Sequence, residues 1–328
     1  MVLILSAKDL KRVLTMRETI VEVEKAFKEL ACGTAVMPTR VGLNVFDGAG
    51  WIGAMPAYLS KAQALGTKIV TSYDTNPSKH GLPTVMALVV LNNPETGKPE
   101  AVLEGCFITE MRTGAASGVA TKYLARYDAS TVGIFGAGTQ ARTQLEAIKE
   151  VRNIQSALVY DIVQERATRF AQEMRQRLEI DVRMERNPNH IVRESDIIVT
   201  ASTSKTPVFR GDMLRSGTHI NAIGSFRPDT RELDDLTISR SKLVVDSVEA
   251  SLQEAGDIII PLKTGVIQRD HIYAELGQIV AGLKAAREND NEITVFKSVG
   301  IGIQDAAAAN LAYRKAREAK IGKRIELD

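Results

Sequence analysis

Cysteine is scarce in this chain, with two residues, Cys32 and Cys106, among 328. A disulfide framework is therefore not expected, and both thiols are predicted to lie buried in a protein of a reducing compartment. The four histidines show no metal-ligand spacing and have no companion cysteines. We therefore assign no metal site.

Excess charge and long apolar runs are also lacking. The formal net charge is +2, with 42 basic residues interleaved among 40 acidic ones, which leaves no basic footprint for nucleic acid. No run approaches the roughly 18–20 apolar residues that span a bilayer. The N-terminal residues MVLILSAKDL carry no signal-peptide cleavage pattern. We expect a cytoplasmic protein with neither nucleic-acid nor membrane partners.

From Thr131 onward, apolar runs alternate with helical patterns. A chain of this length usually forms two domains, and this alternation is typical of a doubly wound parallel sheet covered by helices. Residues 126–301 are therefore predicted to form a Rossmann domain, with helices over 139–151 and 164–177. The predicted strands are 131–135, 156–160, 181–184, 196–200, 219–223, 242–246 and 292–296.

The N-terminal part has a different pattern. A helix over 16–31 precedes strand-like pieces rich in Gly, Pro and Asn, and LVVLNNPETGKPEAVLEG is predicted to form a hairpin. A last helix over 302–319 is expected to pack back on this region. Residues 1–125 with 302–328 are thus predicted to form a smaller α+β domain.

The strongest local motif is Gly136-Ala137-Gly138-Thr139-Gln140-Ala141, which lies directly between a predicted strand and a predicted helix. It fits G-x-G-x-x-G/A, in which Gly136 allows a tight turn, Gly138 lets the backbone approach a pyrophosphate, and Ala141 permits close helix packing. Asp161 ends the next strand, where a carboxylate accepts hydrogen bonds from the adenosine ribose. That carboxylate would repel a 2′-phosphate, which favours NAD(H) over NADP(H).

Three cations lie in apolar or small-residue surroundings: Arg40 in MPTRVGL, Lys68 in ALGTKIV and Arg112 in EMRTGAASG. Each either pairs with a structural carboxylate or binds an anionic ligand. Arg112 is expected near a helix start, where small neighbours allow close approach and a guanidinium could hold a carboxylate with two hydrogen bonds.

The chain resembles the ornithine cyclodeaminase/mu-crystallin family over nearly its whole length. The similarity rests on ordered blocks that include MPTR (37–40), LGTKIV (65–70), RTGAASGVATKYLA (112–125), GAGTQA (136–141), GTHINAIGSFRPDTRELD (217–234) and EITVFKSVGIGIQD (292–305). It implies a Rossmann domain and a smaller domain, residues 1–125 with 302–328, that binds substrate and forms a homodimer.

The resemblance also implies roles for individual residues. Arg40, Lys68 and Arg112 match substrate-binding cations, with Lys68 and Arg112 also taken as catalytic. The strand end Asn221–Gly224 passes the nicotinamide, and Ser298 and Val299 lie in a late loop that touches nicotinamide and substrate. The cofactor contacts are matched by Thr84, Arg112, Gly136, Gly138, Thr139, Gln140, Asp161, Ser202, Ile223, Gly224 and Ser298.

One departure from the family pattern separates its chemistries. Cyclodeaminases carry an acid/base Asp where this chain has Phe226, and phenylalanine cannot transfer a proton. The segment RPDTRELDD (227–235) instead resembles the mu-crystallin branch, which reduces cyclic ketimines. Asp229 and Glu232 are interpreted as carboxylates of a surface loop.

The leading hypothesis is NAD(P)H-dependent reduction of Δ1-pyrroline-2-carboxylate or Δ1-piperideine-2-carboxylate. Three alternatives stay open. They are an alanine dehydrogenase, for which Lys68 is the clear proton-relay candidate, an ornithine cyclodeaminase, and a non-catalytic, dinucleotide-dependent binding protein.

Overall fold

A computed structural model describes residues 1–46 and 50–326. The chain divides into two compact units, Met1–Arg112 with Ile301–Asp328, and Thr113–Gly300. The division falls inside helix α4 (Gly105–Leu124), whereas the sequence analysis expected a boundary at the end of that helix. The C-terminal segment joins the first unit, which is therefore discontinuous in sequence.

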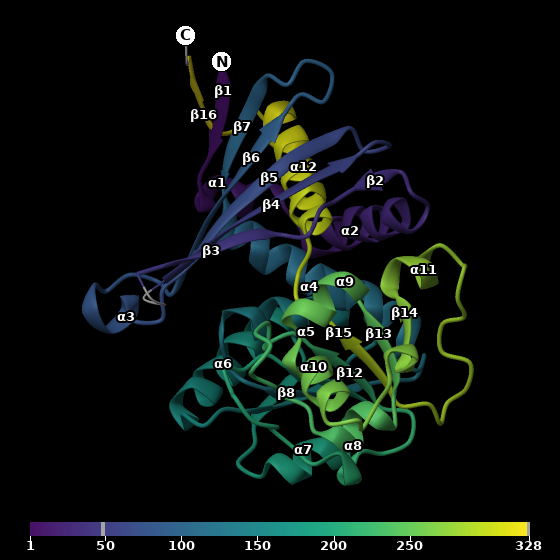
Figure 1. Ribbon diagram of the computed structural model, residues 1–328. Helices are drawn as coiled ribbons and strands as arrows, with labels where there is room; N and C mark the ends of the chain where they lie inside the picture. The colour runs from purple at the N-terminus through teal and green to yellow at the C-terminus, as the bar shows by residue number, and fades with distance from the viewer. Residues whose placement is uncertain (47–49, 327–328) are drawn as a thin grey trace. The chain divides into compact units, whose positions relative to one another are not determined.

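The first unit contains a mixed sheet in the order β16-β1-β7-β6-β5-β4-β2, with β3 paired to β4. Helices α2 and α12 pack together, and α12 also contacts β4 and β5 (Figure 1). The predicted hairpin is present as β6 and β7. The strands are β1 (Val2–Leu5), β2 (Ala35–Val36), β3 (Val41–Val45), β4 (Gly50–Leu59), β5 (Ala64–Ser72), β6 (Val85–Asn92), β7 (Pro99–Glu104) and β16 (Lys323–Ile325), and the helices are α1 (Ala7–Val13), α2 (Met16–Ala31), α3 (Asn76–Lys79) and α12 (Gly302–Glu318).

The second unit contains a parallel sheet in the order β10-β9-β8-β11-β12-β15-β13-β14. Its strands are β8 (Thr131–Phe135), β9 (Ser156–Tyr160), β10 (Asp181–Met184), β11 (Ile197–Thr200), β12 (His219–Ala222), β13 (Lys242–Val245), β14 (Ile272–Glu275) and β15 (Thr294–Lys297). The sequence analysis missed β14, because four residues behind a 3-10 turn carry too little periodicity. The predicted α/β Rossmann architecture is confirmed.

Helices surround this sheet, and α5 begins directly behind the glycine motif, as predicted (Figure 1). Apolar side chains of α5 and α6 join those of the central strands in one buried core. The helices are α5 (Thr139–Val151), α6 (Gln164–Leu178), α7 (Pro188–Glu194), α8 (Asp235–Ser239), α9 (Val248–Glu254), α10 (Gly256–Lys263) and α11 (Leu276–Val280), with 3-10 turns η1 (Gly211–Met213) and η2 (Arg269–His271).

The two cysteines differ from expectation. Both thiols are free, but Cys32 is exposed and Cys106 is half-buried, so the prediction of two buried thiols was wrong. Cys32 follows the last residue of α2 as its C-cap, which takes it out of the packed face of that helix. Within the described residues, no helix combines the length and apolar character needed to cross a membrane.

Candidate active site

The glycine motif forms an open turn at the N-terminus of α5. Gly136 has φ +98°, and a Cβ there would lie 2.5 Å from the Ala201 carbonyl oxygen, so only glycine fits. Gly138 is the N-cap, and a Cβ built on it meets nothing within 4 Å. Its lack of a side chain leaves the first N–H groups of α5 to a ligand. This geometry fits a pyrophosphate.

Asp161 is held against that turn. Its Oδ2 accepts a hydrogen bond from the Ala137 N–H at 2.9 Å, and its Oδ1 accepts one from the Val163 N–H at 2.8 Å. Each carboxylate oxygen has a further lone pair for a ribose hydroxyl. Beside the turn, the buried Oε1 of Gln140 finds no hydrogen-bond partner among the described residues. An orphaned polar atom at this position fits a polar ligand.

Glu232 ties together the ends of two neighbouring strands. Its Oε1 accepts hydrogen bonds from the Ser202 N–H at 2.7 Å and the Ser202 hydroxyl at 2.6 Å, and its Oε2 accepts one from the Gly224 N–H at 2.9 Å. Burial, followed by the charge of Asp257, raises the pKa of Glu232.

The interpretation of Glu232 as a surface carboxylate was therefore wrong, since its side chain has no exposed surface. Asp229, in the same stretch, is exposed, as expected. The sequence analysis erred because a polar stretch such as RPDTRELDD does not show which acid turns inward to bond backbone N–H groups.

A second buried acid holds the loop that follows β15. Asp246 Oδ2 accepts hydrogen bonds from the Ser298 hydroxyl at 2.7 Å, the Val299 N–H at 2.9 Å and the Gly300 N–H at 2.7 Å. Burial raises the pKa of Asp246. The sequence analysis counted this residue as the end of a strand and gave it no role. The available signal was an acid directly behind the apolar run KLVV.

The first unit contains a buried cluster of two cations and one acid. Lys68 of β5 and Arg112 of α4 both contact Asp305 of α12. Lys68 Nζ donates to Asp305 Oδ1 at 2.9 Å, and Arg112 Nε donates to the same oxygen at 2.9 Å. Arg112 also donates to Gln304 Oε1 at 2.8 Å. The sequence analysis assigned no role to Asp305, although an acid among the small residues of GIQDAAAAN was a signal for it.

Burial sets the charge behaviour of this cluster. Burial, followed by the charge of Arg112, lowers the pKa of Lys68 from 10.5 to about 7, against the opposing effect of Asp305. Burial alone would raise the pKa of Asp305, but the charges of Arg112 and Lys68 outweigh it and hold that pKa below its ordinary value. Lys68 can therefore gain or lose a proton near neutral pH.

The remaining predicted residues of this unit are Arg40 and Thr84. Arg40 is half-buried, and its charge lowers the pKa of Lys68 further. Thr84 is half-buried, and its carbonyl accepts a hydrogen bond from the Tyr73 N–H at 2.8 Å. Arg112 lies in the interior of α4, so the expectation of a helix start there was wrong. The small residues of RTGAASG lie inside this helix, where a Cβ at Gly114 would come within 2.6 Å of the Thr143 carbonyl oxygen.

A model of the ornithine cyclodeaminase/mu-crystallin family matches residues 2–320. The protein belongs to this family. Its relatives include a Bacillus cereus Δ1-pyrroline-2-carboxylate reductase, 42% identical over 325 residues and 99% of each chain.

Solved structures of two further family members are similar to this one. The Thermococcus litoralis Δ1-pyrroline-2-carboxylate reductase in complex with NADH and L-proline is 52% identical, with a TM-score of 0.96 over 98% of this chain and 100% of the other. An archaeal alanine dehydrogenase dimer with bound NAD is 39% identical, with a TM-score of 0.94 over 100% and 99%.

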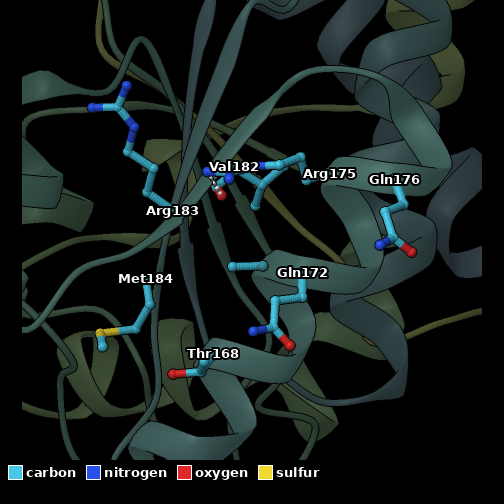
Figure 2. A pocket seen from close by; sticks show the side chains of 8 residues that line it. Thr168, Gln172, Arg175, Gln176, Val182, Arg183 and Met184 are labelled. Atoms are coloured by element: carbon cyan, nitrogen blue, oxygen red, sulfur yellow. Dashed lines mark hydrogen bonds between the residues drawn. The ribbon is translucent and has the colours of Figure 1, made fainter.

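The second unit of this protein also has a hollow of about 380 Å³, which the predicted site residues do not line. Its lining comes from α6 and β10 and includes Thr168, Gln172, Arg175, Val182 and Met184 (Figure 2). Both arginines at its rim, Arg175 and Arg183, pair with Asp181. None of the predicted site residues lines it, so we do not take it as the active site.

Proposed function

We propose that this protein is an NADH-dependent reductase of a small cyclic imino acid. The substrate is Δ1-pyrroline-2-carboxylate, reduced to L-proline, or Δ1-piperideine-2-carboxylate, reduced to L-pipecolate. The observation that carries the proposal is the buried Lys68–Asp305–Arg112 cluster, which combines a fixed guanidinium with an amine whose pKa is about 7. The similarity to a reductase bound to NADH and L-proline supports the same substrate class.

The roles of the cations follow from their chemistry. Arg112 and Arg40 bind the substrate carboxylate, because a guanidinium presents a planar fork of donors. Lys68 orients the ring and supplies the proton at its nitrogen, and Val299 contacts the substrate. Bound NADH supplies a hydride from C4 of its nicotinamide. A cyclic iminium is already electrophilic, so positioning and charge neutralisation contribute most of the acceleration.

The second unit supplies the groups for the dinucleotide. Gly136 and Gly138 with the N-terminus of α5 accommodate the pyrophosphate, and Asp161 accepts from the adenosine ribose, which favours NAD(H) over NADP(H). The family resemblance adds further contacts to the cofactor, namely Thr84, Arg112, Thr139, Gln140, Ser202, Ile223, Gly224 and Ser298.

We also propose that the protein forms a homodimer through the exposed face of the first sheet. Ile69 pairs across the sheet with Leu88 on one side and with Ala54 on the other, and Ala54 pairs with Val41. Their side chains therefore share one face, and Val41, Ile69 and Leu88 are 71%, 42% and 51% exposed. A contiguous apolar sheet face of this kind is typical of a protein interface.

Alanine dehydrogenase is the second candidate, favoured by the similarity to the archaeal enzyme. Reductive amination needs a proton relay for loss of water from the carbinolamine, and Lys68 is suited to it. Phe226 disfavours ornithine cyclodeamination, because phenylalanine cannot transfer a proton. In a non-catalytic binding protein, the buried cations would have no reaction to assist.

One assay panel distinguishes these candidates. Purified protein is mixed with NADH and either pyrroline-2-carboxylate, piperideine-2-carboxylate, or pyruvate with ammonia, and the absorbance of NADH is followed. We expect oxidation of NADH with a cyclic imino acid and much slower oxidation with pyruvate and ammonia. Faster turnover of pyruvate would make the protein an alanine dehydrogenase. No turnover of any substrate, with NADH bound, would make it a binding protein.

A further inference from the structure

The second unit buries more negative than positive charge at one edge of its sheet. Glu232, Asp246, Asp257 and Lys297 are all fully buried. Lys297 Nζ lies 2.8 Å from Asp257 Oδ2, so these two charges compensate each other. Within residues 1–46 and 50–326, no lysine or arginine forms an ion pair with Glu232 or Asp246. Lys297 also acts on Glu232 through its charge, but among these four buried side chains the acids outnumber the lysine by three to one.

Backbone N–H groups donate to both oxygens of Glu232 and of Asp246, and such hydrogen bonds favour the ionised form against the effect of burial on the pKa. Every hydrogen bond that reaches the oxygens of Glu232 comes from an N–H or O–H donor, on Ser202 or Gly224. The same is true of Asp246, whose Oδ1 accepts from the Ser247 N–H at 2.9 Å and whose Oδ2 accepts three further bonds. The hydroxyls of Ser202 and Ser298 could also accept from a protonated carboxyl, so the backbone N–H donors are the ones that favour the charged form.

Both acids lie at the carboxyl ends of the parallel strands. Glu232 holds the residues that follow β11 and β12, and Asp246 follows β13 and holds the loop behind β15. In open parallel sheets, ligands bind beside this edge. The proposed function brings the nicotinamide to these loops, through Ile223, Gly224 and Ser298, and the present inference rests on that proposal.

We propose that the buried charges of Glu232 and Asp246 tune the bound cofactor toward hydride donation. Hydride transfer removes one proton and two electrons from NADH and leaves the cationic ring of NAD⁺. The imine carbon gains the hydride, and the ring nitrogen takes a proton. Fixed negative charge in a low-dielectric interior stabilises the cationic ring and has little effect on the neutral one. Neither acid touches the reacting atoms, so both are positioning residues with an electrostatic effect.

The test is the ratio of two dissociation constants, measured by calorimetric titration of the whole protein with NAD⁺ and with NADH. Glu232→Gln and Asp246→Asn remove one charge each at nearly constant volume. We expect each to raise Kd(NAD⁺)/Kd(NADH) by about tenfold, as the loss of one nearby charge at an effective dielectric of about 20 implies. Glu232→Asp keeps the charge while disturbing the hydrogen bonds, and it should leave the ratio near its wild-type value.

The matched control is Asp196→Asn. Asp196 is also buried, but it precedes β11 and lies at the opposite edge of the same sheet, where Arg126 and Arg215 pair with it. The Asp196→Asn variant should leave Kd(NAD⁺)/Kd(NADH) unchanged. If Glu232→Gln and Asp246→Asn weaken both ligands equally, the acids only hold the loops, and the inference fails. Should one variant not fold, by circular dichroism and thermal unfolding, the other decides. If the wild-type protein binds neither nucleotide, the proposed function itself fails.

Discussion

Lys68 Nζ lies 2.8 Å from Asp305 Oδ2, in an ion pair whose two side chains are 2% and 1% exposed and 237 positions apart in the chain. Removing one partner of such a buried pair leaves an uncompensated charge, which typically costs about 3–5 kcal/mol of stability. Arg112 joins the same carboxylate, so the acid holds both cations in one arrangement.

The pKa of Lys68, about 7, gives a pH dependence with a defined sign. Reduction needs the protonated amine, so kcat/KM for the imine should fall as pH rises through about 7. Oxidation of L-proline needs the neutral amine, so its kcat/KM should fall as pH drops through about 7. Steady-state kinetics in both directions check this.

Two variants isolate Lys68 from the titration of the substrates themselves. Lys68→Ala should remove the change of kcat/KM near pH 7, which forms one limb of the pH profile, in both reaction directions. Asp305→Asn should move that limb to lower pH, because Asp305 raises the pKa of Lys68. A limb that stays near 7 in Lys68→Ala would belong to another group.

Arg112→Lys should reduce kcat/KM by at least ~10-fold, through loss of a charge-assisted hydrogen bond of roughly 1.5–3 kcal/mol. The variant keeps the charge that acts on Lys68, so the pH limb should stay in place. Arg183→Lys is the control, since Arg183 pairs with Asp181 at the surface of the second unit. Unchanged kinetics in folded Arg112→Lys would make Arg112 a structural cation.

Asp161→Asn should shift cofactor preference toward NADPH by about tenfold, which corresponds to roughly 1.4 kcal/mol. The amide oxygen can still accept a bond from the Ala137 N–H, while the charge that repels a 2′-phosphate is gone. Dissociation constants for NADH and NADPH give the result. Equal changes for both cofactors would show that Asp161 does not contact the ribose.

The wild-type protein should release essentially no ammonia from L-ornithine with NAD⁺, because Phe226 replaces the acid/base carboxylate. Phe226→Asp should impair imine reduction and admit a trace of ammonia release, since positioned acid–base catalysis contributes roughly 10²–10⁴-fold. A coupled ammonia assay measures both. Three hydrogen bonds hold Glu232 in place, so Asp229 is the acid that could replace the missing carboxylate. If the wild-type protein does release ammonia, Asp229→Asn tests this. Robust release would contradict the branch assignment.

Leu88→Glu should convert the proposed dimer to a monomer, because it places a charge in the apolar sheet face beside Ile69. Light scattering after size-exclusion chromatography measures the mass. Val21→Glu is the control, since Val21 is similarly exposed, at 44%, on α2 instead of the sheet. A dimer that survives Leu88→Glu would have to use another surface.

The amino-acid sequence determined the elements whose signals are local. Apolar runs of four to five residues placed β8, β9 and β10 at their observed limits, and helical periodicity did the same for α2 and α5. The glycine motif was equally readable, because backbone conformation at Gly136 depends on that residue and its immediate neighbours.

Tertiary structure alone decided which polar side chains became buried partners. Lys68, Arg112 and Asp305 come from a strand and two helices, and no local pattern records that they meet. Glu232 and Asp246 turn inward because N–H groups at strand ends, contributed by distant parts of the chain, need acceptors once water is excluded. Charge and hydrogen-bond pairing between distant segments is a property of the packed chain, so it followed from the fold and not from the order of residues.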